Sequence, residues 1–346
     1  MASVIKFDTW QNTNGEVIAD TAGGARLPLS GNAIINGDFG VSQRGTSFAN
    51  PGNNDYTLDR WNVGVAGGSP TDVTVSRQAF TPADVEAVGY GAGEYYCEID
   101  FTDVGAMTVF QLRQYVEDVQ TFAGQTVTLS FWAKGSSAID LTLLLQQNFG
   151  SGGSSTVTES LGTQTLTTGW TRYSFTVDLD SLSGKTVGSG SYVSVRFDFV
   201  ETNGNVYDIW GVQLEAAPAA TPFRLAGGGA KGAELALCSR YYLRITGEGT
   251  GHRLAPAGYN ENGTTTYTMI MGPQPFRATP SVSHQNVVIR YSGASIVAIG
   301  SITPQFANNN FTNFFVNAAS NVLPTGGTSQ LRTPNSGDYI ELDCEL

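Results

Sequence analysis

Apolar and polar residues alternate one by one in many short segments between residues 32 and 215. Clear examples are residues 126–135, 139–150 and 191–200, and turn residues separate nearly every pair of such segments. A period of two places successive side chains on opposite faces of a strand, whereas no segment has the 3.6-residue period and the length of a confident helix. Short strands at this spacing are typical of a β-sandwich or jelly roll. We therefore predict an all-β fold that begins with a jelly-roll β-sandwich.

The pattern changes in the stretch from Tyr207 to Tyr242. Its first third alternates like a strand, and residues 216–232 then hold two prolines and four glycines with almost no large apolar side chain. Such a segment cannot bury itself, so we expect a connection on the surface. A second apolar run starts at residues 234–244, where a helical turn and a strand both fit the spacing. The predicted parts are a short extended N-terminal arm at residues 1–30, the jelly roll at residues 31–225 and a smaller C-terminal β-sandwich at residues 226–346.

The first 30 residues do not have the pattern of a core. Residues 4–9 alternate, Asn14 and Gly15 supply a turn, and the next residues alternate again, so a small hairpin is predicted. A lone hairpin is marginal in water. We therefore expect this arm to dock elsewhere, with packing onto its own chain as the alternative.

The surface chemistry is predicted to be neutral and polar. Charged residues make up 14% of the chain, against a typical share of about 25%, and 42 glycines take part of their place. The net charge of −12 opposes binding to nucleic acid or to an anionic membrane, because both require a positive field. No stretch approaches the length of an apolar membrane span, and the N-terminus has no signal-peptide pattern. We expect no nucleic-acid partner and no membrane insertion.

Cysteine and histidine are too few and too widely spaced for a zinc site or a disulfide framework. Cys97, Cys238 and Cys344 are therefore predicted to be buried free thiols. The chain also lacks the sequence motifs of serine hydrolases, zinc proteases and nucleotide-binding enzymes. We predict no catalytic residues, no cofactor and no enzyme activity. A glycosidase remains an alternative, because it needs only two carboxylates, for which Asp198 and Asp208 are candidates.

The alternation also predicts which side chains face outward. Where Phe131 and Phe197 face the core, their neighbours Trp132, Arg196 and Asp198 face outward. If these strands share one sheet, its outer face combines an aromatic ring that can stack on a sugar with amides and charges that can bind hydroxyl groups. The predicted glycan-binding residues are Gln111, Arg113, Trp132, Gln146, Arg196 and Asp198.

Two alternatives to a glycan-binding face stay open. A solvated sheet face or a subunit interface would present the same mixture of side chains. Trp132 would belong to the core if the register slipped by one residue.

Two segments of the last part could be exposed tip loops, and receptor contacts tend to lie on loops of a rigid β scaffold. They are the asparagine-rich residues 308–315 and the loop at residues 323–330. Plain connecting loops are the alternative.

An ordered series of segments runs from residue 32 to residue 242: NAIINGDFGVSQRGTSF, YTLDRW, TVTLSFWAKG, QNFGSGGSSTV, TTGWTRYSFTV, IWGVQLEAAPAATPF and ELALCSRYY. This series resembles the modular tail-fibre and minor tail proteins of bacteriophages and prophages, in which a jelly roll similar to carbohydrate-binding modules precedes a small C-terminal β domain. The N-terminal SVIKFDTWQNTNG is similar to the leader that joins a fibre to the virion. PFRATPSV and YIELDCEL are similar to parts of the last domain.

The resemblance implies a structural protein of the phage tail or tail fibre, made in the host cytoplasm and assembled into the virion. Its β domains would serve host attachment by binding a receptor, namely a glycan of the host surface. The implied partners are other tail and virion proteins, the host-surface glycan and two further copies of the chain in a trimer. A purely structural tail or fibre protein without glycan binding is the alternative, and a polysaccharide depolymerase is a less favoured one.

Carbohydrate-binding modules of similar pattern often hold a structural calcium ion, for which the resemblance implies Asp38 and Asp208. Gly40 stands where those modules commonly carry Glu, so one expected oxygen ligand is missing. We therefore predict no metal site, with Asp38 and Asp208 as the residues that a calcium site would use.

Overall fold

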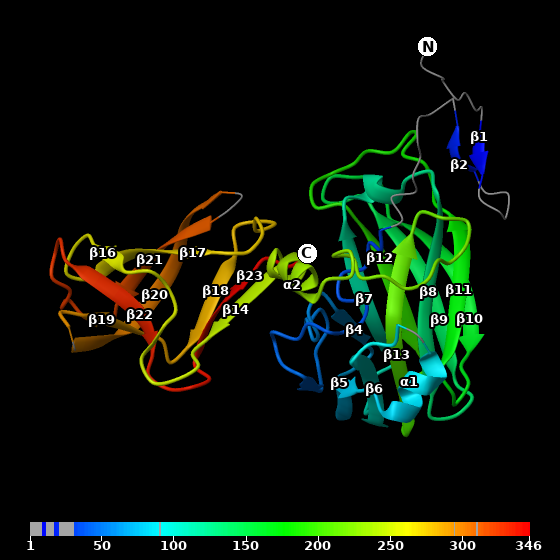
Figure 1. The fold of residues 1–346 in the computed structure, drawn as a ribbon, viewed down its shortest axis with the longest axis horizontal. Helices are drawn as coiled ribbons and strands as arrows, with labels where there is room; N and C mark the ends of the chain where they lie inside the picture. Colours follow the sequence, from blue (N-terminus) through cyan, green and yellow to red (C-terminus); the bar gives the residue numbers. More distant parts are fainter. Residues whose placement is uncertain (1–8, 12–16, 21–30, 90, 294, 309–310) are drawn as a thin grey trace, which may run out of the picture. The chain divides into compact units, whose positions relative to one another are not determined.

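The chain forms two compact units in the computed structural model (Figure 1). The structure describes residues 9–11, 17–20, 31–89, 91–293, 295–308 and 311–346. The first unit comprises Met1–Gly40, Thr46–Thr57 and Trp61–Gly229, and the second comprises Val41–Gly45, Leu58–Arg60 and Ala230–Leu346. The domain boundary predicted between residues 225 and 226 stays a prediction.

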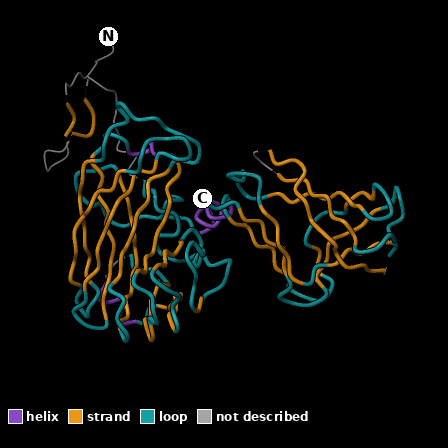
Figure 2. Tube along the Cα trace, turned by 180° about the vertical axis from the view of Figure 1, so that it is seen from behind, coloured by secondary structure: helices purple, strands orange, loops and turns teal. Residues whose placement is uncertain are grey.

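Two antiparallel sheets build the first unit, in which strands are the dominant regular structure (Figure 2). The five-stranded sheet has the order β10 (Val157–Thr165), β9 (Asp140–Asn148), β12 (Tyr192–Phe199), β7 (Val109–Glu117) and β4 (Asn62–Ala66). The six-stranded sheet has the order β11 (Thr171–Asp178), β8 (Thr126–Gly135), β13 (Asn205–Glu215), β6 (Tyr95–Asp103), β5 (Asp72–Ala79) and β3 (Ser47–Ala49). The predicted all-β jelly-roll sandwich is confirmed.

The core of the first unit contains the alternate side chains that the two sheets turn inward. Phe131 of β8 and Phe197 of β12 meet with their ring centroids 5.1 Å apart, and both are fully buried. Trp61 is also fully buried, and its indole N–H donates to the carbonyl of Asn36 at 3.0 Å. Because the buried indole has a hydrogen-bond partner, it adds apolar contact without leaving an unpaired donor.

A short helix, α1 (Pro82–Val88), was not expected from the sequence. Its first turn is a capping box: the Thr81 hydroxyl accepts from the N–H of Asp84, and the Asp84 carboxylate accepts from the N–H of Thr81. Asp84 also pairs with Lys134 Nζ at 3.0 Å and accepts from the indole N–H of Trp170 at 2.8 Å. These contacts fix α1 against the six-stranded sheet. A 3-10 turn, η1 (Val119–Phe122), follows β7.

The second unit starts with a helix, α2 (Lys231–Ser239), so the apolar run whose period was ambiguous begins as helix. A three-stranded sheet follows with the order β14 (Tyr242–Thr246), β23 (Tyr339–Asp343) and β18 (Ser281–Gln285). The seven-stranded sheet has the order β15 (His252–Arg253), β22 (Thr328–Thr333), β16 (Gly258–Asn260), β17 (Thr265–Met271), β21 (Phe311–Ala318), β20 (Ser295–Asn308) and β19 (Val288–Tyr291). Because β19 also pairs with β22, this sheet closes on itself around a core that includes Phe314, Val316 and Leu331.

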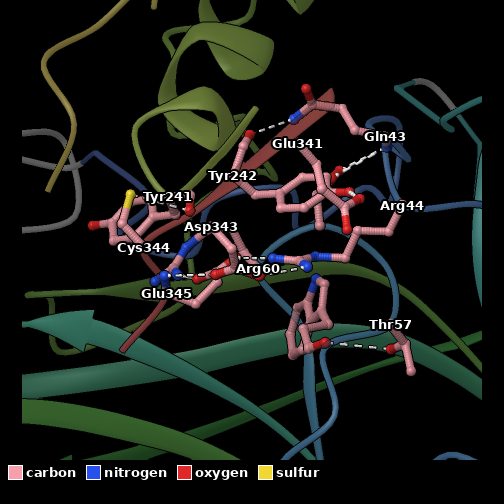
Figure 3. A network of polar contacts seen from close by, with 12 residues as sticks. Gln43, Arg44, Thr57, Arg60, Tyr241, Tyr242, Glu341, Asp343, Cys344 and Glu345 are labelled. Carbon is pink, nitrogen blue, oxygen red and sulfur yellow. Dashed lines mark hydrogen bonds and ion pairs between the residues drawn. The ribbon is translucent and has the colours of Figure 1, made fainter. Parts of the chain in front are cut away.

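Two ion pairs, one of them buried, join the early segments of the second unit to its C-terminal end (Figure 3). Arg44 Nη1 lies 2.8 Å from Asp343 Oδ2, and Arg60 pairs with Glu345. The side chains of Arg60 and Glu345 are only 1% and 4% exposed. The Arg60 guanidinium also lies 3.4 Å from the centroid of the Tyr241 ring. An aromatic face and a carboxylate therefore both stabilise this buried cation.

Only part of the predicted N-terminal arm is described. Within it, β1 (Thr9–Gln11) and β2 (Val17–Asp20) pair antiparallel, which confirms the predicted hairpin. Asn14 and Gly15, the expected turn, lie outside the described residues. The docking of the arm stays a prediction.

Cys97, Cys238 and Cys344 are free and buried, as predicted. Burial raises the pKa of all three thiols, which opposes formation of reactive thiolates.

Among the residues that the structure describes, no helix is long and apolar enough to span a membrane.

Candidate functional site

The outer face of the five-stranded sheet brings together five of the six predicted glycan-binding residues. In the ladder of β12 with β7, Arg196 stands opposite Arg113 and Asp198 stands opposite Gln111. In the ladder of β12 with β9, Ser194 stands opposite Gln146. Directly opposed residues of antiparallel strands point to the same face of a sheet. Their neighbours in each strand are buried in the core, so this face points outward.

Trp132 does not belong to this face, and the prediction that included it is wrong. Its strand, β8, pairs with β11 and β13 in the six-stranded sheet. Trp132 is partly buried there and packs against a cluster that contains Trp170 and Trp210. Alternation alone fixed the direction of the side chain relative to its own strand, but the choice of sheet depends on pairing between distant segments.

Two tyrosines that were not among the predicted site residues lie on the five-stranded face. Tyr115 follows Arg113 by two residues in β7, and Tyr192 precedes Ser194 by two in β12, so both share the outward direction. Their ring centroids are 4.5 Å apart, with an interplanar angle of 44°. The same alternation that identified Arg113 and Arg196 contained the signal for both rings.

The Arg113 guanidinium is held in place by neutral oxygen acceptors. It donates to Asn62 Oδ1 from Nε at 3.0 Å and from Nη2 at 2.6 Å, and Nη2 also donates to the Val63 carbonyl at 2.7 Å. Asn62 is 1% exposed, so the acceptor itself is fixed. Gly64 of β4 makes room for this arrangement, since a Cβ at that position would lie 2.9 Å from Arg113 Cζ. Arg113 is therefore held in position before any ligand binds. These contacts are hydrogen bonds to neutral oxygens, so they do not neutralise its positive charge.

Arg196 and Asp198 form a bidentate ion pair on the same face. Arg196 Nε lies 2.6 Å from Asp198 Oδ1, and its Nη2 lies 2.5 Å from Asp198 Oδ2. The two side chains are 23% and 25% exposed. Two parallel charge-assisted bonds fix the planes of both groups while leaving them open to solvent on one side. Gln111 Nε2 reaches Asp198 Oδ2 at 3.5 Å and extends the polar row.

Amides and hydroxyls continue the row toward the edge of the sheet. Gln146 Nε2 donates to Thr158 Oγ1, and Asn148 Nδ2 donates to Thr156 Oγ1, both at 3.1 Å. Each amide keeps further hydrogen-bonding capacity beyond that one donated bond. The face thus combines aromatic rings, one guanidinium held by neutral acceptors, one ion pair and several amides.

Partial burial raises the pKa of both tyrosine hydroxyls. Burial raises the pKa of Tyr115, which the Arg113 charge partly opposes. Burial and the neighbouring Tyr115 raise the pKa of Tyr192. Both hydroxyls therefore stay protonated at neutral pH and can donate as well as accept a hydrogen bond.

The two residues that a calcium site would use do not fit that metal. The Asp208 carboxylate of β13 lies 3.3 Å from Lys134 Nζ, so a protein cation already occupies its vicinity. Burial raises the pKa of Asp208 to about 7, although Lys134 opposes the shift. Asp38 Oδ1 accepts from the N–H of Gly40 at 3.1 Å. In the part of the chain that the structure describes, no group of three or more His, Cys, Asp or Glu side chains is placed to hold a metal ion.

No protein-family model matches the chain, and no curated protein matches it. Three solved structures illustrate what about half of this chain is similar to. The enzymatically active domain of tailspike protein 4 of bacteriophage CBA120 has a TM-score of 0.36 at 16% identity, over 54% of this chain and 21% of that one. The module TmCBM61 in complex with β-1,4-galactotriose has a TM-score of 0.32 at 15% identity, over 54% of this chain and 99% of that one.

A Stig cyclase from Fischerella sp. TAU has a TM-score of 0.37 at 12% identity, over 55% of this chain and 98% of that one. At such TM-scores and identities, the likenesses establish neither a family nor a function for this chain.

Proposed function

We propose that this chain is a structural protein of a bacteriophage tail or tail fibre that recognises a glycan of the host surface. The proposed binding site is the tyrosine face, which we define as Tyr115 and Tyr192 together with Gln111, Arg113, Gln146, Arg196 and Asp198. The rest of the first unit serves as its rigid scaffold.

The observation that carries this proposal is the tyrosine pair beside fixed polar groups. A pyranose ring has an apolar face of C–H groups and a polar rim of hydroxyls. The rings of Tyr115 and Tyr192 offer an aromatic surface to the first, and Arg113 and the Arg196–Asp198 pair offer donors and acceptors to the second. Because hydrogen bonds already hold these polar side chains, binding would immobilise few additional rotamers.

The phage context rests on the sequence resemblance and not on the fold. The N-terminal arm would attach the chain to another virion protein, and assembly as a trimer would multiply weak contacts with a repetitive glycan. We propose that the chain does not cleave the glycan. In support, the carboxylate of Asp198 on the tyrosine face is engaged by Arg196 through both oxygens.

A glycan array probed with the purified full chain tests the binding function. We expect retention on host-surface polysaccharide and loss of that retention for Arg113→Ala, with Trp132→Phe as a control on the other sheet. Absence of binding to any polysaccharide of the host would leave the purely structural role.

Two further measurements test the other parts of the proposal. Immunogold electron microscopy of the phage particle should label the tail, and label confined to another part of the particle would contradict the tail assignment. Release of new reducing ends from a bound polysaccharide would contradict the non-catalytic role and favour a depolymerase.

A further inference from the structure

The second unit contains a cavity of about 650 Å³ in which all the charged side chains of the wall are positive. Arg253, Arg290 and Arg332 all line it, together with polar groups such as Gln330 and Thr328. Among the described residues that form its wall, none carries a carboxylate. The whole chain has 30 acidic and 18 basic residues, so three arginines without an acidic neighbour in the wall are a marked local exception.

Strand pairing places these arginines on one face of the seven-stranded sheet. Arg253 of β15 stands directly opposite Arg332 of β22, and Arg290 of β19 stands opposite Gln330. Gln330 and Arg332 are two residues apart in β22, so their side chains point to the same side. The intervening Leu331 is 1% exposed and belongs to the core, which shows that the arginine side points outward.

The contacts of these arginines within the described structure are to neutral oxygens. Arg332 donates to the Gly251 carbonyl at 2.9 Å and, from Nη2, to Gln330 Oε1 at 2.8 Å. Arg290 Nε donates to the Gly293 carbonyl. No ion pair with a carboxylate involves Arg253, Arg290 or Arg332 among the residues that the structure describes.

Like charges directly opposite one another destabilise a sheet. The arrangement of Arg253 and Arg332 therefore carries a cost that an anion placed between them would remove. Loss of hydration lowers the pKa of Arg332. The charges of Arg290 and Arg253 lower it further, and this second effect reflects the same repulsion. Guanidinium groups bind carboxylate and phosphate with two parallel hydrogen bonds, so three of them make a specific receptor for such a group.

An exposed aromatic ring extends the same face. Tyr259 of β16 stands opposite Thr328, which is two residues before Gln330 in β22. The Tyr259 side chain is 56% exposed, so its ring is accessible to a ligand. Thr328 itself lines the cavity. A ligand with an anionic group and an adjoining ring could thus contact the arginines and Tyr259 at once.

We propose that this arginine cleft, formed by Arg253, Arg290 and Arg332, binds an acidic saccharide through its carboxylate or phosphate group. A neutral polar wall with Gln330 and Thr328 suits the hydroxyls of the sugar, and Tyr259 suits its apolar face. The net charge of −12 opposes extended contact with a nucleic acid. The site lies in the second unit, so it is independent of the tyrosine face of the first.

An array of sialylated, uronic-acid-containing and phosphorylated oligosaccharides, each beside its neutral parent, tests this inference with the full chain. We expect binding to acidic members only, and a loss of affinity as salt rises, because the attraction is screened. Calorimetry on the best acidic oligosaccharide should show binding weakened at least about tenfold by Arg290→Gln and by Arg253→Gln. Lys185→Gln, which removes one positive charge from the first unit outside both proposed sites, should leave it unchanged.

Several outcomes would overturn the inference. Equal binding of the neutral parents would show that the acidic group of the saccharide is not needed for binding. Inorganic phosphate bound as tightly as the acidic saccharide would indicate a simple anion site, and tighter binding of a short single-stranded DNA would indicate a nucleic-acid site. Unchanged affinity in Arg253→Gln and Arg290→Gln would place the ligand elsewhere. Arg253 is exposed, so its variant should fold as the wild type does, which circular dichroism checks.

Discussion

Tyr115 and Tyr192 come from the neighbouring strands β7 and β12, and their ring centroids lie 4.5 Å apart on the outer face of the five-stranded sheet. A tilted aromatic pair at this distance is favourable in itself. It also makes a continuous apolar surface in a face that is otherwise charged and polar. Such a surface is where we expect the ring of a sugar to lie.

Gly64→Ala should weaken glycan binding without unfolding the protein. A Cβ at this position would lie 2.6 Å from Gln111 Oε1 and 2.9 Å from Arg113 Cζ, so both flexible side chains would have to move. We expect an affinity loss of about tenfold, which corresponds to about 1.4 kcal/mol. Calorimetry with the bound glycan measures it, and thermal unfolding checks the fold. Unchanged affinity would mean that the positions of Gln111 and Arg113 do not matter for binding.

Trp132→Phe should leave glycan binding at the tyrosine face unchanged. Trp132 lies on the other sheet of the sandwich and packs against an aromatic cluster there. Phenylalanine keeps an aromatic side chain in that position and limits the loss of packing. The same calorimetric titration measures the effect. A large loss of affinity with intact folding would move the binding site to the six-stranded sheet.

Asp208→Asn should change how stability depends on pH. Burial raises the pKa of Asp208 in the folded protein to about 7, above its ordinary value of 3.8. Between these values the folded state binds more protons than the unfolded state, so the favourable contribution of protonated Asp208 is complete below about pH 4 and is lost as pH rises through 7. Asparagine does not titrate, so the variant does not lose stability in this way as the pH rises. Its free energy of unfolding relative to the wild type should therefore rise between pH 4 and pH 8, by up to about 4 kcal/mol.

Urea denaturation across that pH range measures the difference. Asp72→Asn, at an exposed position, is the matched control and should run parallel to the wild type. If the Asp208→Asn curve also ran parallel to the wild type, the raised pKa of Asp208 would be contradicted.

Glu345→Gln should destabilise the second unit. The change removes the negative charge that pairs with the Arg60 guanidinium, which is 1% exposed, while Arg44 keeps Asp343. Removing one member of a buried ion pair typically costs about 3–5 kcal/mol. Urea denaturation should show a loss near the lower end of that range, because glutamine can still accept a hydrogen bond. Glu248→Gln, an exposed change of the same chemistry, is the control, and equal stability of the two variants would contradict the importance of the pair.

Local alternation allowed the direction of many side chains to be predicted. Phe131, Phe197 and Leu145 face the core as the period of two required, and Arg113 and Arg196 face outward. The reason is that alternation is a property of one strand and needs no knowledge of its neighbours. The all-β class followed for the same reason.

The membership of each strand in a sheet could not be predicted in this way. Trp132 was grouped with Arg113 because both point outward, yet β8 and β7 belong to different sheets. The same limit hid the arginine cleft, because Arg253, Arg290 and Arg332 are far apart in the sequence and meet only through the pairing of three strands. By contrast, α1 had a local signal in its capping box, Thr81 to Asp84 with Pro82 between them.

The most direct test of the glycan-binding account is calorimetric titration of the bound glycan into the wild type, Tyr115→Ala and Tyr192→Ala, with Tyr115→Phe and Tyr192→Phe as controls that keep the rings. The account predicts that each alanine variant folds normally and binds about tenfold or more weakly, while each phenylalanine variant keeps most of the affinity. Wild-type affinity in both alanine variants would contradict it.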